Sequence, residues 1–269
     1  MVRVATFNLH AGVDGWGRPT GVVERAAALQ PDVLICPETW RGEDGGDLYL
    51  ELSDRLGMHG VFVALARAER ARTWTGGRSW QPRLAHFTGE RGLYFSEHRS
   101  LTRFQHRRRA DDTTEPGEWG LALLTRLTIE DLRVESLGRL PRERVRRAVI
   151  IATLDDRGRR FHVVAVHGAH LSHGSFLQYR RVRGLIAQLD PSLPIILGGD
   201  FNSWRPLLRL FLPGWTSLVR ARTWPARRPH SQIDHLFARG PWTSMGGGAL
   251  DGGSDHRMLF ADVALRDGT

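Results

Sequence analysis

The sequence contains no lysine, and all 38 of its basic residues are arginine. Because it has only 29 Asp and Glu residues, its formal net charge is +9 and its pI is about 11.1. A basic balance of this size points toward an anionic partner, such as nucleic acid or a phosphorylated surface. The exclusive use of arginine equally fits a biased coding composition, so the charge leaves both explanations open.

Cysteine and long apolar runs are also scarce. The single cysteine, Cys36, excludes an intramolecular disulfide and a zinc site built from several cysteines. No stretch approaches the roughly 20 consecutive apolar residues that a transmembrane helix needs. Residues 1–6 show no charged leader followed by an apolar core, so we expect no signal peptide and a cytoplasmic location. We also expect a monomer.

The apolar pattern predicts short strands interrupted by a few helices. A sheet-rich chain of 269 residues can fold as one domain, and no linker composition divides it, so we expect a single domain over residues 1–269. Apolar runs of strand length occupy residues 2–7, 33–36, 60–65, 120–125, 127–134, 148–154, 161–167, 194–197, 233–238 and 258–265. Helical patterns occupy residues 22–30, 48–56 and 176–189.

The periodicity fails between Ala66 and Trp119, where arginines are interleaved with Trp, Phe and Tyr. We expect a long loop region here, of a kind that is often functional in a compact domain. Arginines supply phosphate contacts and aromatic rings supply base stacking, which favours a nucleic-acid surface. The alternative role of its tryptophans is to anchor the core or the loop.

Six short segments carry acid, amide and imidazole side chains, mostly where an apolar run gives way to a polar loop. They are Thr6-Phe7-Asn8-Leu9, Pro37-Glu38-Thr39, His170-Leu171, Gly198-Gly199-Asp200-Phe201-Asn202, Gln232-Ile233-Asp234-His235 and Ser254-Asp255-His256. Each segment alone has an ordinary explanation as a turn, a cap or a backbone-satisfying amide. Together, oxygen ligands for a divalent cation and groups suited to proton transfer are what the hydrolysis of a phosphate ester requires.

Part of this set suits a magnesium ion. Glu38 directly follows a buried strand and Pro37, and Mg²⁺ prefers one or two carboxylates together with waters and substrate oxygens. Asn8 can add a carbonyl ligand or orient that carboxylate without adding charge. Asp255 is the further candidate near the metal.

Another part of the set suits the attacking water. Asp200 and Asn202 are two residues apart, so in extended geometry they project to the same side. Asp200 would accept a proton from the water, while Asn202 would orient the water or hold a phosphate oxygen. The preceding pair Gly198-Gly199 would let the backbone approach the substrate closely.

The imidazoles suit the phosphate and the leaving group. A carboxylate raises the basicity of a histidine and keeps its ring oriented, so Asp234 would hold His256 as a cation against the phosphate. His170 is a second imidazole for phosphate contact or leaving-group protonation. We interpret His10, His167, His173 and His235 as structural or peripheral, because a lone histidine has many such roles.

In their order and context these segments resemble the endonuclease/exonuclease/phosphatase superfamily, which includes DNase I-like nucleases, abasic-site endonucleases, sphingomyelinases and inositol polyphosphate 5-phosphatases. The resemblance runs from Val4 to about Val263 and is most specific at 199–202 and 254–256. It implies an α/β fold, a four-layer sandwich of two mixed β-sheets packed face to face with helices outside. It also implies Mg²⁺- or Mn²⁺-dependent, in-line attack by water, with the roles given above for Asn8, Glu38, His170, Asp200, Asn202, Asp234, Asp255 and His256.

The substrate is less constrained than the reaction. A nuclease that cleaves DNA or RNA is predicted first, because the charge and the arginine–aromatic segment fit it. The alternative is a phosphatase or phosphodiesterase that acts on a phospholipid headgroup or a small phosphorylated metabolite, with the arginines as compositional bias. A non-catalytic binding module is disfavoured because it would be expected to lack one of the reactive residues, and all are present.

Overall fold

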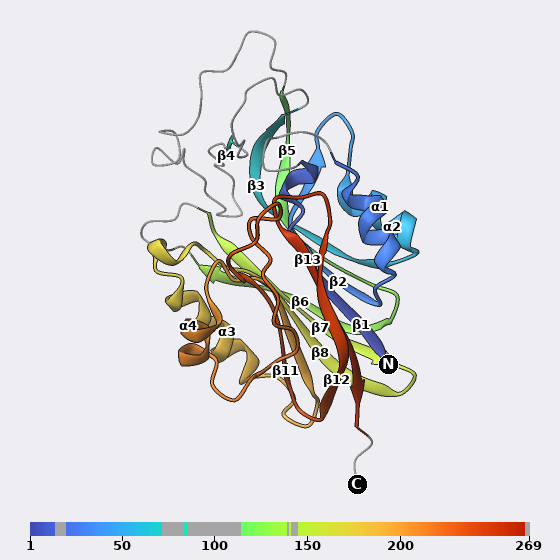
Figure 1. Ribbon diagram of the computed structural model, residues 1–269, viewed down its shortest axis with the longest axis vertical. Helices are drawn as coiled ribbons and strands as arrows, with labels where there is room; N and C mark the ends of the chain where they lie inside the picture. Colours follow the sequence, from blue (N-terminus) through green and yellow to red (C-terminus); the bar gives the residue numbers. More distant parts are fainter. Residues whose placement is uncertain (14–19, 72–82, 85–113, 139, 141–144, 267–269) are drawn as a thin grey trace.

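Two mixed β-sheets form the frame of this computed structural model, which describes residues 1–13, 20–71, 83–84, 114–138, 140 and 145–266 (Figure 1). The first sheet has seven strands, in the order β12 (Trp242–Asp251), β13 (Arg257–Leu265), β1 (Val2–Thr6), β2 (Val33–Gly42), β5 (Thr114–Thr125), β3 (His59–Ala71) and β4 (Arg83–Leu84). The second has six strands, in the order β10 (Thr216–Ser217), β11 (Asp234–Arg239), β9 (Ile195–Asp200), β8 (Arg159–His167), β7 (Arg147–Asp156) and β6 (Thr128–Gly138).

Helices cover the outer side of each sheet, which confirms the predicted four-layer α/β sandwich (Figure 1). Helices α1 (Val22–Leu29) and α2 (Leu48–Leu56) lie on the side of the first sheet, and α3 (Phe176–Ile186) and α4 (Arg205–Phe211) on the side of the second. The predicted bounds of α2 are confirmed because both ends are capped: the Asp47 carboxylate accepts two backbone N–H groups, and Gly57 adopts the left-handed conformation. Among the described residues, no helix is long and apolar enough to span a membrane.

The central strand β8 shows why the apolar runs lack alternation. Val163 and Ala165 pack in the core shared with the first sheet, whereas Val164 and Val166 pack against α3. Since successive side chains of a strand point to opposite faces, a strand that is covered on both faces needs apolar residues at every position. The same double burial explains the other continuous runs of the second sheet.

Two pairs of parallel strands place the carboxyl ends of four strands at one rim of the sandwich. β1 and β2 are parallel and joined through α1, and β8 and β9 are parallel and joined through α3. All other pairs are antiparallel. In open α/β sheets, ligands bind outside the carboxyl ends of parallel strands, so this rim is where a site is expected.

Three element predictions are corrected by the structure. The expected loop of 66–119 is strand at both ends, because β3 continues to Ala71 and β5 begins at Thr114, paired with each other throughout. Residues 72–82 and 85–113 of that region lie outside the described residues. Strand β2 extends beyond the predicted 33–36 to Gly42, and β12 was not predicted because its Gly246–Gly248 segment has no apolar pattern.

Candidate active site

Three titratable residues lie side by side across the second sheet, at the end where β8 and β9 stop. Asp200 is the register partner of His167 on one side and of Asp234 on the other. All three side chains are buried, with relative exposure of 1% or less. Neighbouring strands are about 5 Å apart, so this row concentrates an imidazole and two carboxylates in a space of two strand spacings.

Asn8 and Glu38 approach the row from the first sheet. The Asn8 side-chain amide donates to Oε1 of Glu38 at 3.1 Å and to Oδ2 of Asp200 at 3.0 Å. Its carbonyl oxygen accepts the backbone N–H of His10 at 3.0 Å, which fixes the orientation of the amide. One neutral side chain therefore links the carboxylates of the two sheets, an arrangement consistent with the orienting role predicted for Asn8.

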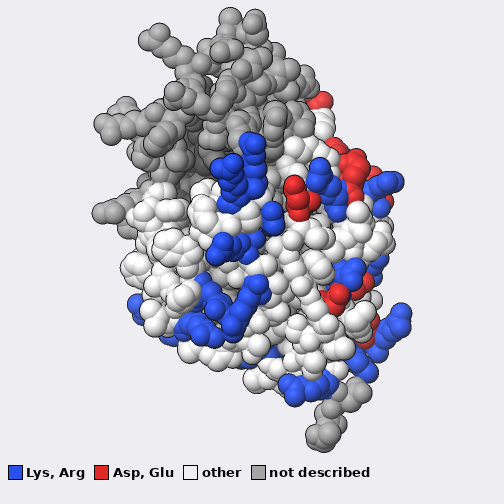
Figure 2. Space-filling model, in the orientation of Figure 1, with Lys and Arg blue, Asp and Glu red and all other residues white. Residues whose placement is uncertain are grey.

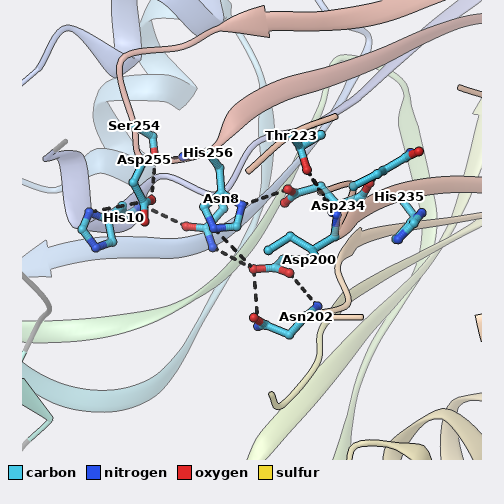
Figure 3. Close-up of polar contacts among 12 residues, drawn as sticks. Asn8, His10, Asp200, Asn202, Thr223, Asp234, His235, Ser254, Asp255 and His256 are labelled. Atoms are coloured by element: carbon cyan, nitrogen blue, oxygen red, sulfur yellow. Dashed lines mark hydrogen bonds and ion pairs between the residues drawn. The ribbon is translucent and has the colours of Figure 1, made fainter. Parts of the chain in front are cut away.

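His256 and Asp234 form a buried pair beside this link (Figure 3). Nδ1 of His256 donates to Oδ2 of Asp234 at 2.8 Å, and its Nε2 lies 4.0 Å from Oδ2 of Asp200. Burial alone would lower the pKa of His256, but the charges of Asp234 and Asp255 outweigh it and hold the pKa well above its ordinary value. The ring is therefore an imidazolium aimed at the centre of the cluster.

Asp200 carries the most perturbed carboxyl group of the cluster. Burial and the charge of Asp234 raise the pKa of Asp200 to about 7. Its Oδ1 accepts the backbone N–H of Asn202 at 2.7 Å, and the Asn202 amide donates to the carbonyl of Gly168 at 3.1 Å. A carboxyl group with a pKa near neutrality is suited to accept a proton from water.

Two members of the cluster have left-handed backbones, and that of Glu38 is strained. Glu38 (φ 56°) and Asn202 (φ 49°) adopt the left-handed conformation, and Glu38 lies at a β-bulge in the pairing of β2 with β5. Asparagine adopts this region readily, whereas for glutamate it costs about 1–3 kcal/mol and persists only when the surroundings impose it. Such strain concentrates at functional sites, which supports this cluster as one.

A tryptophan donates a hydrogen bond to Glu38, and an arginine packs on the ring of that tryptophan. The indole N–H of Trp119 donates to Oε2 of Glu38 at 3.3 Å, so each carboxylate oxygen has a donor. The Arg147 guanidinium lies over the Trp119 ring, 5.1 Å from its centroid, and the His167 ring lies 5.1 Å from the same centroid. Burial, together with the positive charges of Arg147 and His256, lowers the pKa of His167 well below its ordinary value.

The structure brings most of the predicted residues together, with two differences. His170 is exposed, and its Nδ1 pairs with the Ser172 hydroxyl at 2.7 Å, so none of its described contacts joins it to the cluster. His167 was interpreted as structural or peripheral, yet it lies 3.9 Å from Glu38 and 4.0 Å from Asp200. The available signal was its place as the last residue of a buried strand, the position shared by Asp200.

Asp255 and the glycine pair differ in detail from their predictions. The Asp255 carboxylate lies 3.8 Å from Nδ1 of His10, a histidine interpreted as peripheral (Figure 3). A Cβ atom at Gly199 would lie 1.8 Å from the Val166 carbonyl, and one at Gly198 would lie within 3 Å of Leu236. The two glycines are therefore needed for close packing inside the protein rather than for approach to a substrate.

The donor set fits a hard divalent cation. Ligand atoms of Glu38, His167 and Asp200 lie within 4.8 Å of one another, and so do those of Asp200, Asp234 and His256. Oδ1 of Asp234 is buried without a hydrogen-bond partner among the described residues. Buried carboxylates at this density repel each other unless a cation neutralises them, and oxygen ligands are those that Mg²⁺ and Mn²⁺ prefer.

Comparison with known proteins gives one family and one fold. The model of the Endonuclease/Exonuclease/phosphatase family matches residues 5–256. No curated protein matches the sequence.

Solved structures share the fold at low sequence identity. An endonuclease/exonuclease/phosphatase family protein from Leptotrichia buccalis is 12% identical (TM-score 0.66), with 98% of this chain and 100% of that chain covered. A mannosyl-6-phosphatase from Bacteroides thetaiotaomicron is 14% identical (TM-score 0.64; 98% and 100% covered). The human Nocturnin catalytic domain with bound sulfate is 17% identical (TM-score 0.60; 98% and 94% covered).

Proposed function

Because this chain belongs to the endonuclease/exonuclease/phosphatase family, we propose that it is a divalent-metal-dependent phosphoester hydrolase, with a nucleic-acid phosphodiester as its substrate. The observation that carries the reaction class is the Asn8 amide, which joins Glu38 to Asp200 across the two sheets beside the His256–Asp234 pair. This arrangement supplies cation ligands, a proton acceptor and a cationic phosphate contact within one buried cluster.

Glu38 would hold the Mg²⁺ or Mn²⁺ ion, with Asp255 as the further candidate near it. Asn8, predicted as a ligand or as an orienting group, would orient the carboxylates, because its N–H groups face Glu38 and its carbonyl accepts the His10 N–H. A bound divalent cation neutralises phosphate charge and lowers the pKa of its water. The Trp119 N–H and the Asn8 amide keep the Glu38 carboxylate in one orientation, so that little reorganisation is needed when the ion binds.

The remaining residues act on the water and the phosphate. Asp200 accepts the proton of the attacking water, since its pKa near 7 makes it an effective base at neutral pH. Asn202, fixed by Gly168, orients that water or a phosphate oxygen. The His256 imidazolium, held by Asp234, neutralises the charge that grows on the phosphate oxygens.

The two other imidazoles differ in position. His167 lies neutral and buried between Glu38 and Asp200, where it can contact a phosphate oxygen or a metal-bound group. His170 remains a predicted group for the leaving side, because it is exposed three residues beyond the end of β8.

Nucleic acid is favoured as the substrate by the net charge of +9, in a chain whose basic residues are all arginine. The alternative is a phospholipid headgroup or a small phosphorylated metabolite. The fold is compatible with it, since the Bacteroides thetaiotaomicron protein is a mannosyl-6-phosphatase.

The test is an activity panel on the purified protein with Mg²⁺, Mn²⁺ or EDTA. It includes duplex, single-stranded and abasic DNA, RNA, sphingomyelin, phosphoinositides and a sugar phosphate, with Asp200→Ala as the inactive control. We expect hydrolysis that requires the metal, is lost in Asp200→Ala, and falls steeply with salt on nucleic acid. Absence of metal-dependent hydrolysis of any phosphoester would refute the reaction class, and preference for a lipid or sugar phosphate would refute the nuclease assignment.

A further inference from the structure

Three arginines gather beside the loop that carries Asn202. Arg205 is the first residue of α4, three positions after Asn202, and Arg209 lies one helical turn further on the same face. Arg220 comes from the segment that follows β10, and its charge is close enough to act on Arg205. Arg205 and Arg209 share one face of α4, and the charge of Arg220 acts on Arg205; the three are called here the Arg205 cluster.

No ion pair among the described residues neutralises the Arg205 cluster. Nη1 of Arg205 is buried without a hydrogen-bond partner among the described residues. Burial and the charges of Arg220 and Arg209 lower the pKa of Arg205, and no carboxylate acts on it in the opposite direction. From Phe201 to Ile233 the chain contains no Asp or Glu, and the described surface over α3 and α4, at the left of Figure 2, shows no acidic residue.

An exposed aromatic ring adjoins the cluster. Trp204, which precedes Arg205, has 57% of its surface exposed. Its backbone is fixed, because its carbonyl accepts the N–H groups of Leu207 and Leu208 at the start of α4. A flat ring that is already held in place stacks on a base at low entropic cost.

The cluster also begins next to the catalytic loop, because Trp204 and Arg205 follow Asn202 by two and three residues. Arg205 contributes to the lowered pKa of His235, which is mainly due to burial of that ring. Nε2 of His235 contacts the carbonyl of Ser203 at 2.9 Å, and the ring packs with Phe201 and Phe237 on the helix side of β11, the face opposite to Asp234. A polymer that continues from the catalytic loop along the start of α4 would place its next groups over Trp204 and the arginines.

We propose that Arg205, Arg209 and Arg220 form a second phosphate-binding subsite, with Trp204 stacking on a base of single-stranded nucleic acid that extends from the active site. This subsite rests on the proposed hydrolytic function and adds to it a binding site for the neighbouring nucleotide. Guanidinium groups pair with phosphate oxygens through a fork of donors, and indole rings stack on any base.

An anionic membrane is the competing occupant. Phe176, Leu177 and Leu210 are exposed on the same two helices, and apolar side chains among arginines also suit a lipid surface. Because a tryptophan also suits a membrane interface, the discriminating observation is position: Trp204 lies two residues after Asn202, in the loop of the candidate active site. The alternation of ring and guanidinium next to the catalytic loop thus favours a nucleotide chain.

The experiment compares a polymer with a substrate that has one phosphate. Binding of a labelled single-stranded oligonucleotide of about eight nucleotides is measured by fluorescence anisotropy on the Asp200→Ala protein in EDTA. Hydrolysis of the oligonucleotide and of bis(4-nitrophenyl) phosphate is measured on otherwise wild-type proteins. The variants are Trp204→Ala and the double change Arg209→Gln with Arg220→Gln, both at exposed positions. Arg157→Gln, in the turn between β7 and β8 at the opposite end of β8, is the matched control.

We expect each test variant to bind the oligonucleotide at least about fivefold more weakly and to raise its KM similarly. The double variant should also reduce the salt dependence of binding by about one unit of slope. Hydrolysis of bis(4-nitrophenyl) phosphate should stay within about twofold of wild type, because one phosphate occupies only the catalytic site.

Equal losses on both substrates, or no loss on either, would overturn the subsite. If the test variants instead lose binding to phosphatidylcholine vesicles with about 20% phosphatidylserine and keep oligonucleotide binding, the surface is a lipid site and the proposal is wrong. A wild-type protein that hydrolyses no phosphoester of the activity panel with Mn²⁺ refutes the proposed function, whereas the anisotropy in EDTA still tests the binding surface.

Discussion

The indole N–H of Trp119 donates to Oε2 of Glu38 at 3.3 Å, from the strand next to the one that carries Glu38. The Arg147 guanidinium lies over the face of the Trp119 ring. A cation over an indole ring draws electron density from it and so makes its N–H a better donor. The pair therefore holds the Glu38 carboxylate without placing a charged donor on it.

Trp119→Phe keeps the ring and removes the N–H, so it isolates this hydrogen bond. Loss of a group that orients a metal ligand typically weakens metal binding by about tenfold or more. We expect the Mn²⁺ affinity of the apoprotein, measured by calorimetric titration, to fall by about tenfold, while kcat at saturating metal stays close to wild type. Trp215→Phe, which changes a half-buried tryptophan in the segment just before β10, is the control. An unchanged metal affinity in Trp119→Phe would contradict the positioning role.

The left-handed backbone of Glu38 predicts that the side chain needed for activity makes the folded state less stable. Glu38→Gly and Glu38→Ala both remove the carboxylate, but only alanine keeps the Cβ atom that disfavours φ 56°. We therefore expect Glu38→Gly to be more stable than Glu38→Ala by about 1 kcal/mol in urea unfolding, with both variants inactive. The same pair of changes at exposed Arg41 of the same strand, whose φ is not positive, should favour alanine instead. An advantage of alanine at both positions would show that Glu38 stores no strain.

Asp234→Asn tests the charge that keeps His256 protonated. The substitution preserves shape but removes the charge that, together with Asp255, raises the His256 pKa, so the ring would hold its proton less tightly. We expect kcat to fall on the order of 100-fold to 10,000-fold, with little change in the melting temperature measured by circular dichroism. Full activity in Asp234→Asn would remove His256 from the proposed mechanism.

Most of the cluster was predictable because its residues stand where the sequence pattern changes. Asp200, Asp234 and Glu38 lie at an end of or just beyond an apolar run, and the four-layer fold brings those ends to one rim. His167 was harder to interpret, because it belongs to the same apolar strand as His162. Because successive residues of a strand point to opposite faces, these two histidines lie on opposite faces of β8. Only the pairing of His167 with Asp200 shows which face belongs to the site.

The strands that were missed lack an apolar pattern for a physical reason. In β12, a Cβ atom at Gly247 would lie 2.5 Å from the Phe260 carbonyl, so the strand needs glycine where a pattern would need an apolar residue. At the start of β5, Pro116 and Gly117 read as a turn in sequence, and pairing with β3 and β2 overrides that preference. Trp119 lies in this extension, and its contact with Glu38 was therefore not predictable from the sequence.

His235 should make the protein less stable in mild acid. Burial lowers the pKa of His235 to about 4, whereas an unfolded histidine has a pKa of about 6.5. Between these values the unfolded state binds the proton and the folded state does not, so stability falls as the pH falls. The contribution is fully present above pH 6.5 and is lost towards pH 4, with an upper magnitude of roughly 3 kcal/mol.

His235→Gln keeps a donor for the Ser203 carbonyl and removes the titration. Urea unfolding of wild type and variant at about pH 7 and pH 4.5 separates this histidine from the other titrating groups, because those are common to both proteins. We expect the stability advantage of the wild type over the variant to shrink by about 2 kcal/mol at the lower pH. A constant difference between the two proteins would mean that His235 is not held neutral in the folded state.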